Sequence, residues 1–373
     1  MTSRTALLLA AALLLGAAAC GDDDTATPAT TLAPTTVEVS APPSSDPAGT
    51  TGATGANNAE PTTTTPTAPD GAAFPRTVEH AMGATEIPAA PTRVVTLDMS
   101  FVDAALALDT PIIGYVLYQD PDGSLPTYFG DALTTLAAGA TYLGDLLAPN
   151  LEQIAAARPD LILTSKVRHE ALYPQLSAIA PTIMSESAGA GWKDNIRLSA
   201  EALGREDRAE AVISAYEERA ATVGAAVNAA AGDPVVSIVR VASLDAFRIY
   251  QRASFIGVVL DDAGIARPAN QQSLDPATFI VEASYENLTE ADAGADRLFY
   301  TIFGNEDPAD EQAIAGRAML EGNPLWANLP TVLAGNAQEM SDETWMSAVG
   351  MFGAQAVLDD LADAFGVDPA RGG

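Results

Sequence analysis

Apolar and polar residues follow two different patterns along most of the chain. Short runs rich in β-branched residues, at 93–97, 111–116 and 160–164, are typical of buried strands. Helical stretches lie between these runs, for example over 101–108, which Ser100 can cap, and apolar positions spaced three and four residues apart mark the longest of them. Strands that alternate with helices in this way predict a layered α/β architecture that begins near Phe74.

The longest uninterrupted helical pattern runs from Glu206 to about Ala230. At 1.5 Å per residue this helix would be about 37 Å long. Glycine precedes it at Gly204, and Gly232-Asp233-Pro234 ends it before strand–helix alternation restarts. One apolar stripe follows it: Ala209, Val212, Ile213, Tyr216, Ala220, Val223 and Val227.

This break on both sides of one helix predicts two α/β lobes joined by a single long helix. The predicted boundaries are 74–204 for the N-terminal lobe, 205–232 for the helix and 233–373 for the C-terminal lobe. One large α/β domain with a long peripheral helix is the alternative.

The N-terminal segment has neither pattern. A short basic start is followed by the apolar run Ala6–Ala19, which is shorter than the roughly 20 residues that span a bilayer. Residues 1–19 therefore resemble a secretory signal peptide. Residues 20–73 are rich in Thr, Pro and Ala and have no hydrophobic period, which predicts a disordered tether.

Cys20 is the only cysteine in the chain and directly follows Ala17-Ala18-Ala19. A lone cysteine cannot form an internal disulfide. Its position resembles a bacterial lipobox, although Ala17 stands where leucine is usual. We expect Cys20 to carry lipid and to anchor the protein to the outer face of the cell membrane. Ordinary cleavage before Cys20, which would release the protein, is the alternative.

Charge and motif content favour a binding protein over an enzyme. The chain has 49 acidic and 18 basic residues, a formal charge of −31, which disfavours a nucleic-acid partner. Two histidines and one cysteine exclude a His/Cys metal cage, and no nucleophile elbow, phosphate loop or zincin motif occurs. His169 follows Arg168 in an expected loop, where a solvent-exposed side chain is anticipated.

Five segments together resemble the iron-siderophore substrate-binding proteins of bacterial ABC importers. They are "PTRVVTLDMSFVDAALALDTPIIGY", "YLGDLLAPNLEQIAAARPDLILTSKVRHEALYPQLSAIAPTI", "GWKDNIRLSAEALGREDRAEAVISAYEERAA", "RIYQRASFIGVVLDDAGIARP" and "WMSAVGMFGAQAVLDDLADAF". The resemblance extends over 74–365. It implies two lobes bridged by one long helix, a ligand cleft between them and little domain closure.

The resemblance also implies a function and partners. The protein would capture a ferric siderophore, as a monomer without a cofactor, and deliver it to an ABC permease and its ATPase. Haem or corrinoid capture by the same architecture is the alternative, and Tyr118 or Tyr250 would then be a haem ligand. No protein side chain is expected to bind the iron directly.

Each lobe contains one glutamate in the same local setting. Glu152 follows the capping residue Asn150 by two positions, and Glu286 follows Ser284 in the same way. In both lobes a helix, an aspartate and a strand come next. The resemblance implies that one glutamate per lobe docks on arginines of the two permease subunits. Helix capping together with the helix dipole is the alternative explanation.

The candidate ligand contacts are bases and an aromatic residue near strand ends. They are Lys166, Arg168, Arg240, Arg248 and Tyr250. Ligands of layered α/β proteins gather beyond the carboxyl ends of strands. The resemblance implies basic contacts at Lys166 and Arg240, and in so acidic a chain we expect this pair to hold one anionic chelate from opposite lobes.

Other candidates have equally good structural explanations. Trp192 and Trp345 would lie at the rim of the cleft or, alternatively, in the core. Arg168 and Arg248 would contact the ligand or form surface salt bridges.

Overall fold

The computed structural model describes residues 73–118 and 123–371. The predicted signal peptide, Cys20 and all but the last residue of the predicted tether lie outside the described residues. In the described part of the chain, no helix has both the length and the apolar character that crossing a membrane requires.

The first lobe is built on a six-stranded sheet of order β6-β5-β4-β3-β7-β8, in which only the β5–β6 pair is antiparallel. A hairpin of β1 (Arg76–His80) and β2 (Gly83–Ile87) precedes it. The strands are β3 (Val94–Thr96), β4 (Ile112–Leu117), β5 (Thr141–Asp145), β6 (Ala148–Pro149), β7 (Leu161–Ser165) and β8 (Thr182–Ser185).

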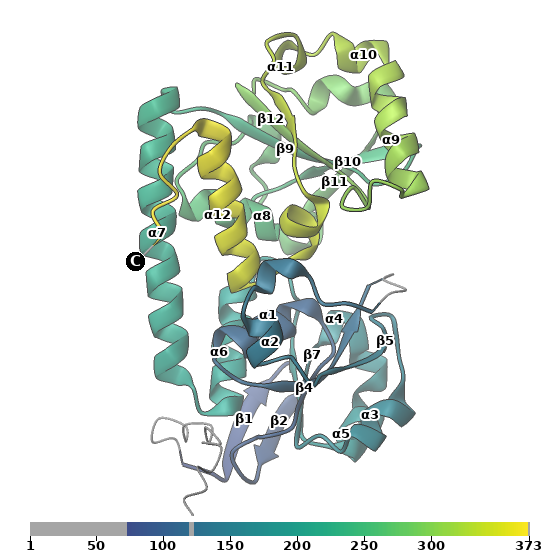
Figure 1. Cartoon of the computed structure of the whole chain (residues 1–373), viewed down its shortest axis with the longest axis vertical. Helices are drawn as coiled ribbons and strands as arrows, with labels where there is room; N and C mark the ends of the chain where they lie inside the picture. The colour runs from purple at the N-terminus through teal and green to yellow at the C-terminus, as the bar shows by residue number, and fades with distance from the viewer. Residues whose placement is uncertain (1–72, 119–122, 372–373) are drawn as a thin grey trace, which may run out of the picture. The chain divides into compact units, whose positions relative to one another are not determined.

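Helices cover both faces of this sheet (Figure 1). Every residue of β7 is buried, which explains its continuous apolar run. Leu161 and Leu163 pack towards helices α1 and α6, while Ile162 packs towards α3 and α5. The helices and 3-10 turns are α1 (Met99–Ala107), η1 (Thr127–Phe129), α2 (Ala132–Thr135), α3 (Leu151–Ala157), α4 (Lys166–His169), η2 (Glu170–Leu172), α5 (Tyr173–Ile179) and α6 (Trp192–Leu203).

The second lobe has a mixed five-stranded sheet of order β11-β10-β9-β12-β13. β9, β12 and β13 are parallel, and β10 and β11 extend the sheet antiparallel. The strands are β9 (Val236–Val241), β10 (Ala246–Tyr250), β11 (Ile280–Ser284), β12 (Arg297–Ile302) and β13 (Ala337–Glu339). Around them lie α8 (Phe255–Asp262), η3 (Ala269–Gln271), η4 (Pro276–Thr278), η5 (Tyr285–Glu290), α9 (Glu311–Gly322), α10 (Pro324–Ala327), α11 (Pro330–Leu333), η6 (Glu343–Ser347, a π-helix) and α12 (Met351–Phe365).

Helix α7 (Glu206–Ala231) connects the lobes and packs on α6, α8 and α12. It ends at Gly232, whose left-handed conformation (φ 75°) is typical of a helix C-terminus. Six of the seven predicted stripe positions are fully buried; Val212 is half-buried. Gly224 completes the stripe, because a Cβ there would lie 1.6 Å from the carbonyl oxygen of Ala263 in the second lobe.

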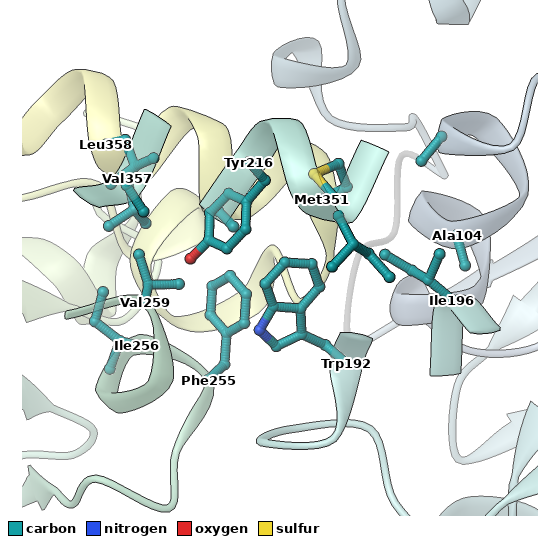
Figure 2. Packing of buried hydrophobic residues seen from close by; sticks show 14 of the residues in the cluster. Ala104, Trp192, Ile196, Tyr216, Phe255, Ile256, Val259, Met351, Val357 and Leu358 are labelled. Atoms are coloured by element: carbon teal, nitrogen blue, oxygen red, sulfur yellow. The ribbon is translucent and has the colours of Figure 1, made fainter. Parts of the chain in front are cut away.

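One hydrophobic core runs from the first sheet through the α7 stripe into the second lobe. Trp192, the first residue of α6, stands at its centre (Figure 2). Its ring centroid lies 5.0 Å from that of Tyr216 in α7 and 6.2 Å from that of Phe255 in α8. The prediction of two α/β lobes joined by one long helix is confirmed, and the shared core means that the lobes are packed together as well as linked. The exact domain boundaries stay a prediction.

A buried carboxylate strengthens this connection. Asp103 of α1 accepts hydrogen bonds from the backbone N–H groups of Met351, Phe352 (2.9 Å) and Gly353 (3.3 Å), the first turn of α12. These groups have no partner within their own helix, so the carboxylate serves as a remote cap. Burial raises the pKa of Asp103 to about 7, while the three N–H donors act in the opposite sense. Gly350 permits the approach, since a Cβ there would lie 2.2 Å from the Asp103 Cγ.

We expect Asp103→Ala to lower the free energy of unfolding by about 3 kcal/mol, because three buried N–H groups lose their acceptor. Urea denaturation followed by circular dichroism measures the change. Asp131→Ala, at an exposed position of the same lobe, is the control and should shift stability by less than about 0.5 kcal/mol. Equal stabilities of the two variants would contradict the capping role of Asp103.

Candidate functional site

The first group of candidate residues lies on α4, directly after β7. His169 is buried: its Nδ1 lies 2.6 Å from the Thr164 hydroxyl and its Nε2 lies 2.7 Å from the Leu146 carbonyl oxygen. A carbonyl only accepts, so Nε2 carries the proton and Nδ1 accepts from Thr164. Burial lowers the pKa of His169. The expectation of a solvent-exposed histidine is wrong. The His169 side chain points into the protein, where its ring donates a hydrogen bond to the carbonyl oxygen of Leu146.

Lys166 and Arg168 lie beside a shallow surface depression of about 460 Å³. The Lys166 Nζ lies 3.3 Å from a carboxylate oxygen of Glu186, and the Arg168 Nε lies 3.6 Å from Asp98. Asp98 is buried and caps α1 through the backbone N–H of Ser100 (3.1 Å). Val167, Glu170 and Ala171 complete the lining.

The second group lies on the sheet of the second lobe. Arg240 of β9 stands directly opposite Arg248 of β10 in the antiparallel register. Glu282 of β11 is the next residue on one side, and Thr301 of β12 is the next on the other. Residues paired across neighbouring strands point to the same face of a sheet, so these four side chains form a row across four strands.

Arg240 is held from several sides. Its Nε donates to Asp342 Oδ1 at 2.7 Å, its Nη2 donates to Asp342 Oδ2, and the Thr301 hydroxyl donates to the same carboxylate at 2.7 Å. Its guanidinium carbon lies 4.9 Å from the centre of the Phe303 ring. Burial alone would lower the pKa of Arg240, but Asp342 and the Tyr250 hydroxyl raise it above its usual value.

The remaining candidates of this lobe differ in exposure. Tyr250 is 8% exposed and adjoins Arg240. Arg248 is partly exposed and forms an ion pair of 3.3 Å with Glu282. In the first lobe, Tyr118, which is with Tyr250 one of the two alternative haem ligands, is 49% exposed just after β4.

The prediction that Trp192 and Trp345 lie at a rim is wrong, because both side chains are fully buried. Trp192 packs between the lobes as described above. Trp345 packs on Phe299, with 5.2 Å between ring centroids, and donates its indole N–H to Asp360 at 2.8 Å. Both indoles fill the shared core, so neither is available to a ligand.

Glu152 and Glu286 are both exposed, at the start of α3 and of η5. Asn150 caps α3 by accepting the Gln153 N–H at 3.1 Å, whereas the Ser284 side chain makes no capping bond to η5. Within residues 73–118 and 123–371, neither glutamate takes part in an ion pair. Capping therefore uses Asn150 in one lobe and leaves both glutamate carboxylates free for another partner.

The aspartate that follows each glutamate has the same structural role in the two lobes. Asp160, just before β7, accepts the backbone N–H groups of Thr92 and Arg93, both at 2.8 Å, ahead of β3. Asp296, just before β12, accepts the N–H of Val235 at 2.9 Å, ahead of β9. Since β7 pairs with β3 and β12 pairs with β9, the two glutamates occupy equivalent positions in the two lobes.

Sequence reasoning missed the acidic partners of the bases: Asp98, Glu186, Glu282 and Asp342. Acids are so numerous that none of them was distinctive. It also missed Lys193, whose Nζ lies 2.8 Å from Glu217 of α7 and 3.0 Å from Asp262 of α8. The position of Lys193 beside Trp192 at the start of a helix was the available signal. In the part of the chain that the structure describes, no group of three or more His, Cys, Asp and Glu residues could hold a metal ion.

Comparison with known proteins identifies the family. A family model described as periplasmic binding protein matches residues 140–343. The chain belongs to the periplasmic binding protein family. The match includes both glutamates, Glu152 and Glu286, and the bases from Lys166 to Arg248.

Individual relatives of this periplasmic binding protein include lipoproteins and solved structures. The probable siderophore-binding lipoprotein YfiY of Bacillus subtilis is 37% identical, over 78% of this chain and 87% of the relative. The achromobactin-binding periplasmic protein of Dickeya dadantii is 28% identical, over 74% and 87%. The crystal structure of Staphylococcus aureus SirA complexed with staphyloferrin B is 28% identical, with a TM-score of 0.69 over 79% of this chain and 99% of that one. They confirm the family resemblance of the sequence.

We expect the stability that His169 contributes to depend on pH. Because its pKa is lowered from the usual 6.5 in the folded protein, the unfolded chain binds the proton more readily, and stability is lost as pH falls below about 6.5. Urea midpoints of the parent and of His169→Gln, measured at pH 7.5 and pH 5.0, test this. The advantage of the parent should shrink at the lower pH, and an advantage independent of pH would contradict a buried neutral imidazole.

Proposed function

We propose that this protein captures a ferric siderophore outside the cytoplasm and delivers it to an ABC importer. The observation that carries the proposal is the placement of bases at strand ends in both lobes of a periplasmic binding protein. Lys166 and Arg168 follow β7 in the first lobe, and Arg240 lies near the end of β9 in the second. The relatives named for siderophore binding support the same function.

The bases would act on the chelator and leave the iron to it. Lys and Arg side chains donate hydrogen bonds but have no lone pair for a metal, so they suit the oxygen atoms around a chelated ferric ion. We assign this role to Lys166, Arg168, Arg240 and Arg248, with Tyr250 adding its hydroxyl beside Arg240. The ligand would lie between the two lobes, and the core they share would keep closure small.

We further propose that the protein works as a lipid-anchored monomer. Cys20 would bear the lipid, because it is the only cysteine and follows an apolar run with small residues. Residues 21–73 would act as the tether that lets the binding lobes reach the permease.

A panel of ligands tests the function. Ferric hydroxamate, ferric catecholate, ferric citrate, haem and cobalamin are titrated into the protein, and binding is measured by isothermal titration calorimetry. We expect saturable binding of at least one ferric chelate and none of haem or cobalamin. Saturable binding of haem or cobalamin alone would reject siderophore capture in favour of the alternative ligand, and binding of none of the five would reject both.

We expect Glu152→Ala with Glu286→Ala to leave ligand affinity unchanged and to reduce uptake sharply. Exposed charge pairs contribute only about 0.2–1 kcal/mol each, so the double variant should lose more than either single variant. Uptake of the labelled ferric chelate in cells that lack the parent gene measures the effect.

Glu201→Ala with Glu218→Ala is the matched control, since both residues are exposed on α6 and α7. This control should transport like the parent. Normal uptake by the Glu152/Glu286 double variant would contradict the docking role without affecting the proposal of ligand capture.

A further inference from the structure

Each of the four bases assigned to ligand binding already has a carboxylate partner. Two pairs belong to the first lobe: Lys166 with Glu186 at 3.3 Å and Arg168 with Asp98 at 3.6 Å. Two belong to the second: Arg240 with Asp342, and Arg248 with Glu282 at 3.3 Å. The four positive and four negative side chains sum to zero, and Glu170 adds one further acid to the lining of the depression in the first lobe, so the candidate site has no net positive charge to attract an anion.

The Arg240–Asp342 pair is the most constrained of the four. Its side chains are 11% and 4% exposed. Asp342 receives two bonds from Arg240 and one from Thr301, and its backbone N–H donates to Asn305 Oδ1 at 2.8 Å. Separating the pair would leave a buried carboxylate without its counter-charge, which is strongly unfavourable. A ligand at Arg240 therefore meets Asp342 as well.

The other three pairs are more exposed, but they too exert little net electrostatic field on a ligand at a distance. In each of them the opposite charges lie within 4 Å, so their fields largely cancel beyond the pair itself. The rest of the molecule adds repulsion for an anion, because acids outnumber bases by 49 to 18 in the chain. Because the four bases are paired, they add little positive field to set against this background.

We propose, on the basis of the proposed function, that the ligand is a ferric chelate without net charge, of the trihydroxamate class. Three singly charged hydroxamates neutralise one ferric ion, whereas three catecholates leave a complex with a charge of −3. The outer N–H groups of the paired bases donate to the chelate oxygens as hydrogen-bond donors, and their charge stays compensated by the paired acids. This replaces the expectation of an anionic chelate held by Lys166 and Arg240.

The first test compares chelates of different charge. Isothermal titration calorimetry at low and at physiological salt gives dissociation constants for a ferric trihydroxamate without other ionisable groups, a ferric tricatecholate and ferric citrate. We expect the trihydroxamate to bind at least about ten-fold more tightly than either anion, with an affinity nearly independent of salt.

The second test changes the charge of the site. Glu186→Gln with Glu282→Gln leaves two bases without counter-charges. The ratio of the tricatecholate to the trihydroxamate dissociation constant should then fall about ten-fold. Glu201→Gln with Glu218→Gln makes the same change of total charge on α6 and α7, and should leave that ratio within about two-fold of the parent.

The outcomes separate the two proposals. Tighter binding of ferric citrate or the tricatecholate by the parent overturns the charge assignment and leaves siderophore capture standing. An unchanged ratio in Glu186→Gln with Glu282→Gln also overturns the charge assignment. Failure of all three ferric chelates to bind overturns both the proposed function and the inference.

Discussion

The apolar stripe of α7 has to be covered from both lobes, and this requirement organises the rest of the molecule. Trp192 covers it from the first lobe and Phe255 covers it from the second, with Tyr216 of α7 between them. Gly224 lets the second lobe approach the helix closely. A connection of this kind differs from a flexible hinge, because separating the lobes would expose large aromatic side chains to water.

Polar contacts fix the relative position of the two lobes where they pack on α7. Asp103 of the first lobe caps α12, and Lys193 links α6 to α7 and α8 through Glu217 and Asp262. The Tyr216 hydroxyl donates to Asp262 at 3.1 Å, so the aromatic core and the ionic contacts meet at one residue. Buried polar groups tolerate few alternative arrangements, and the two lobes are therefore held in register as well as together.

The sequence predicted the features that depend on local pattern. The apolar period of 206–230 gave the long helix, and the alternation of strands and helices gave the two lobes. The repeated order of cap, glutamate, helix, aspartate and strand located Asp160 and Asp296, which have equivalent hydrogen bonds. Side-chain direction was harder to predict. Trp192 and His169 both lie next to basic residues, yet tertiary packing turns them inward, and no local signal distinguishes that from exposure.

The bases of the candidate site could be predicted from the sequence, but the acids that pair with them could not. A base near the end of a strand is visible in sequence, but its partner comes from another part of the chain: Asp342 lies 102 residues after Arg240. In a chain with 49 acids, such a partner cannot be recognised from composition. Rarity of bases therefore does not by itself indicate an anionic ligand. In an acidic protein, burying an arginine near a ligand is easiest when an acid is buried with it, and recognition then depends on the direction of hydrogen bonds more than on net charge.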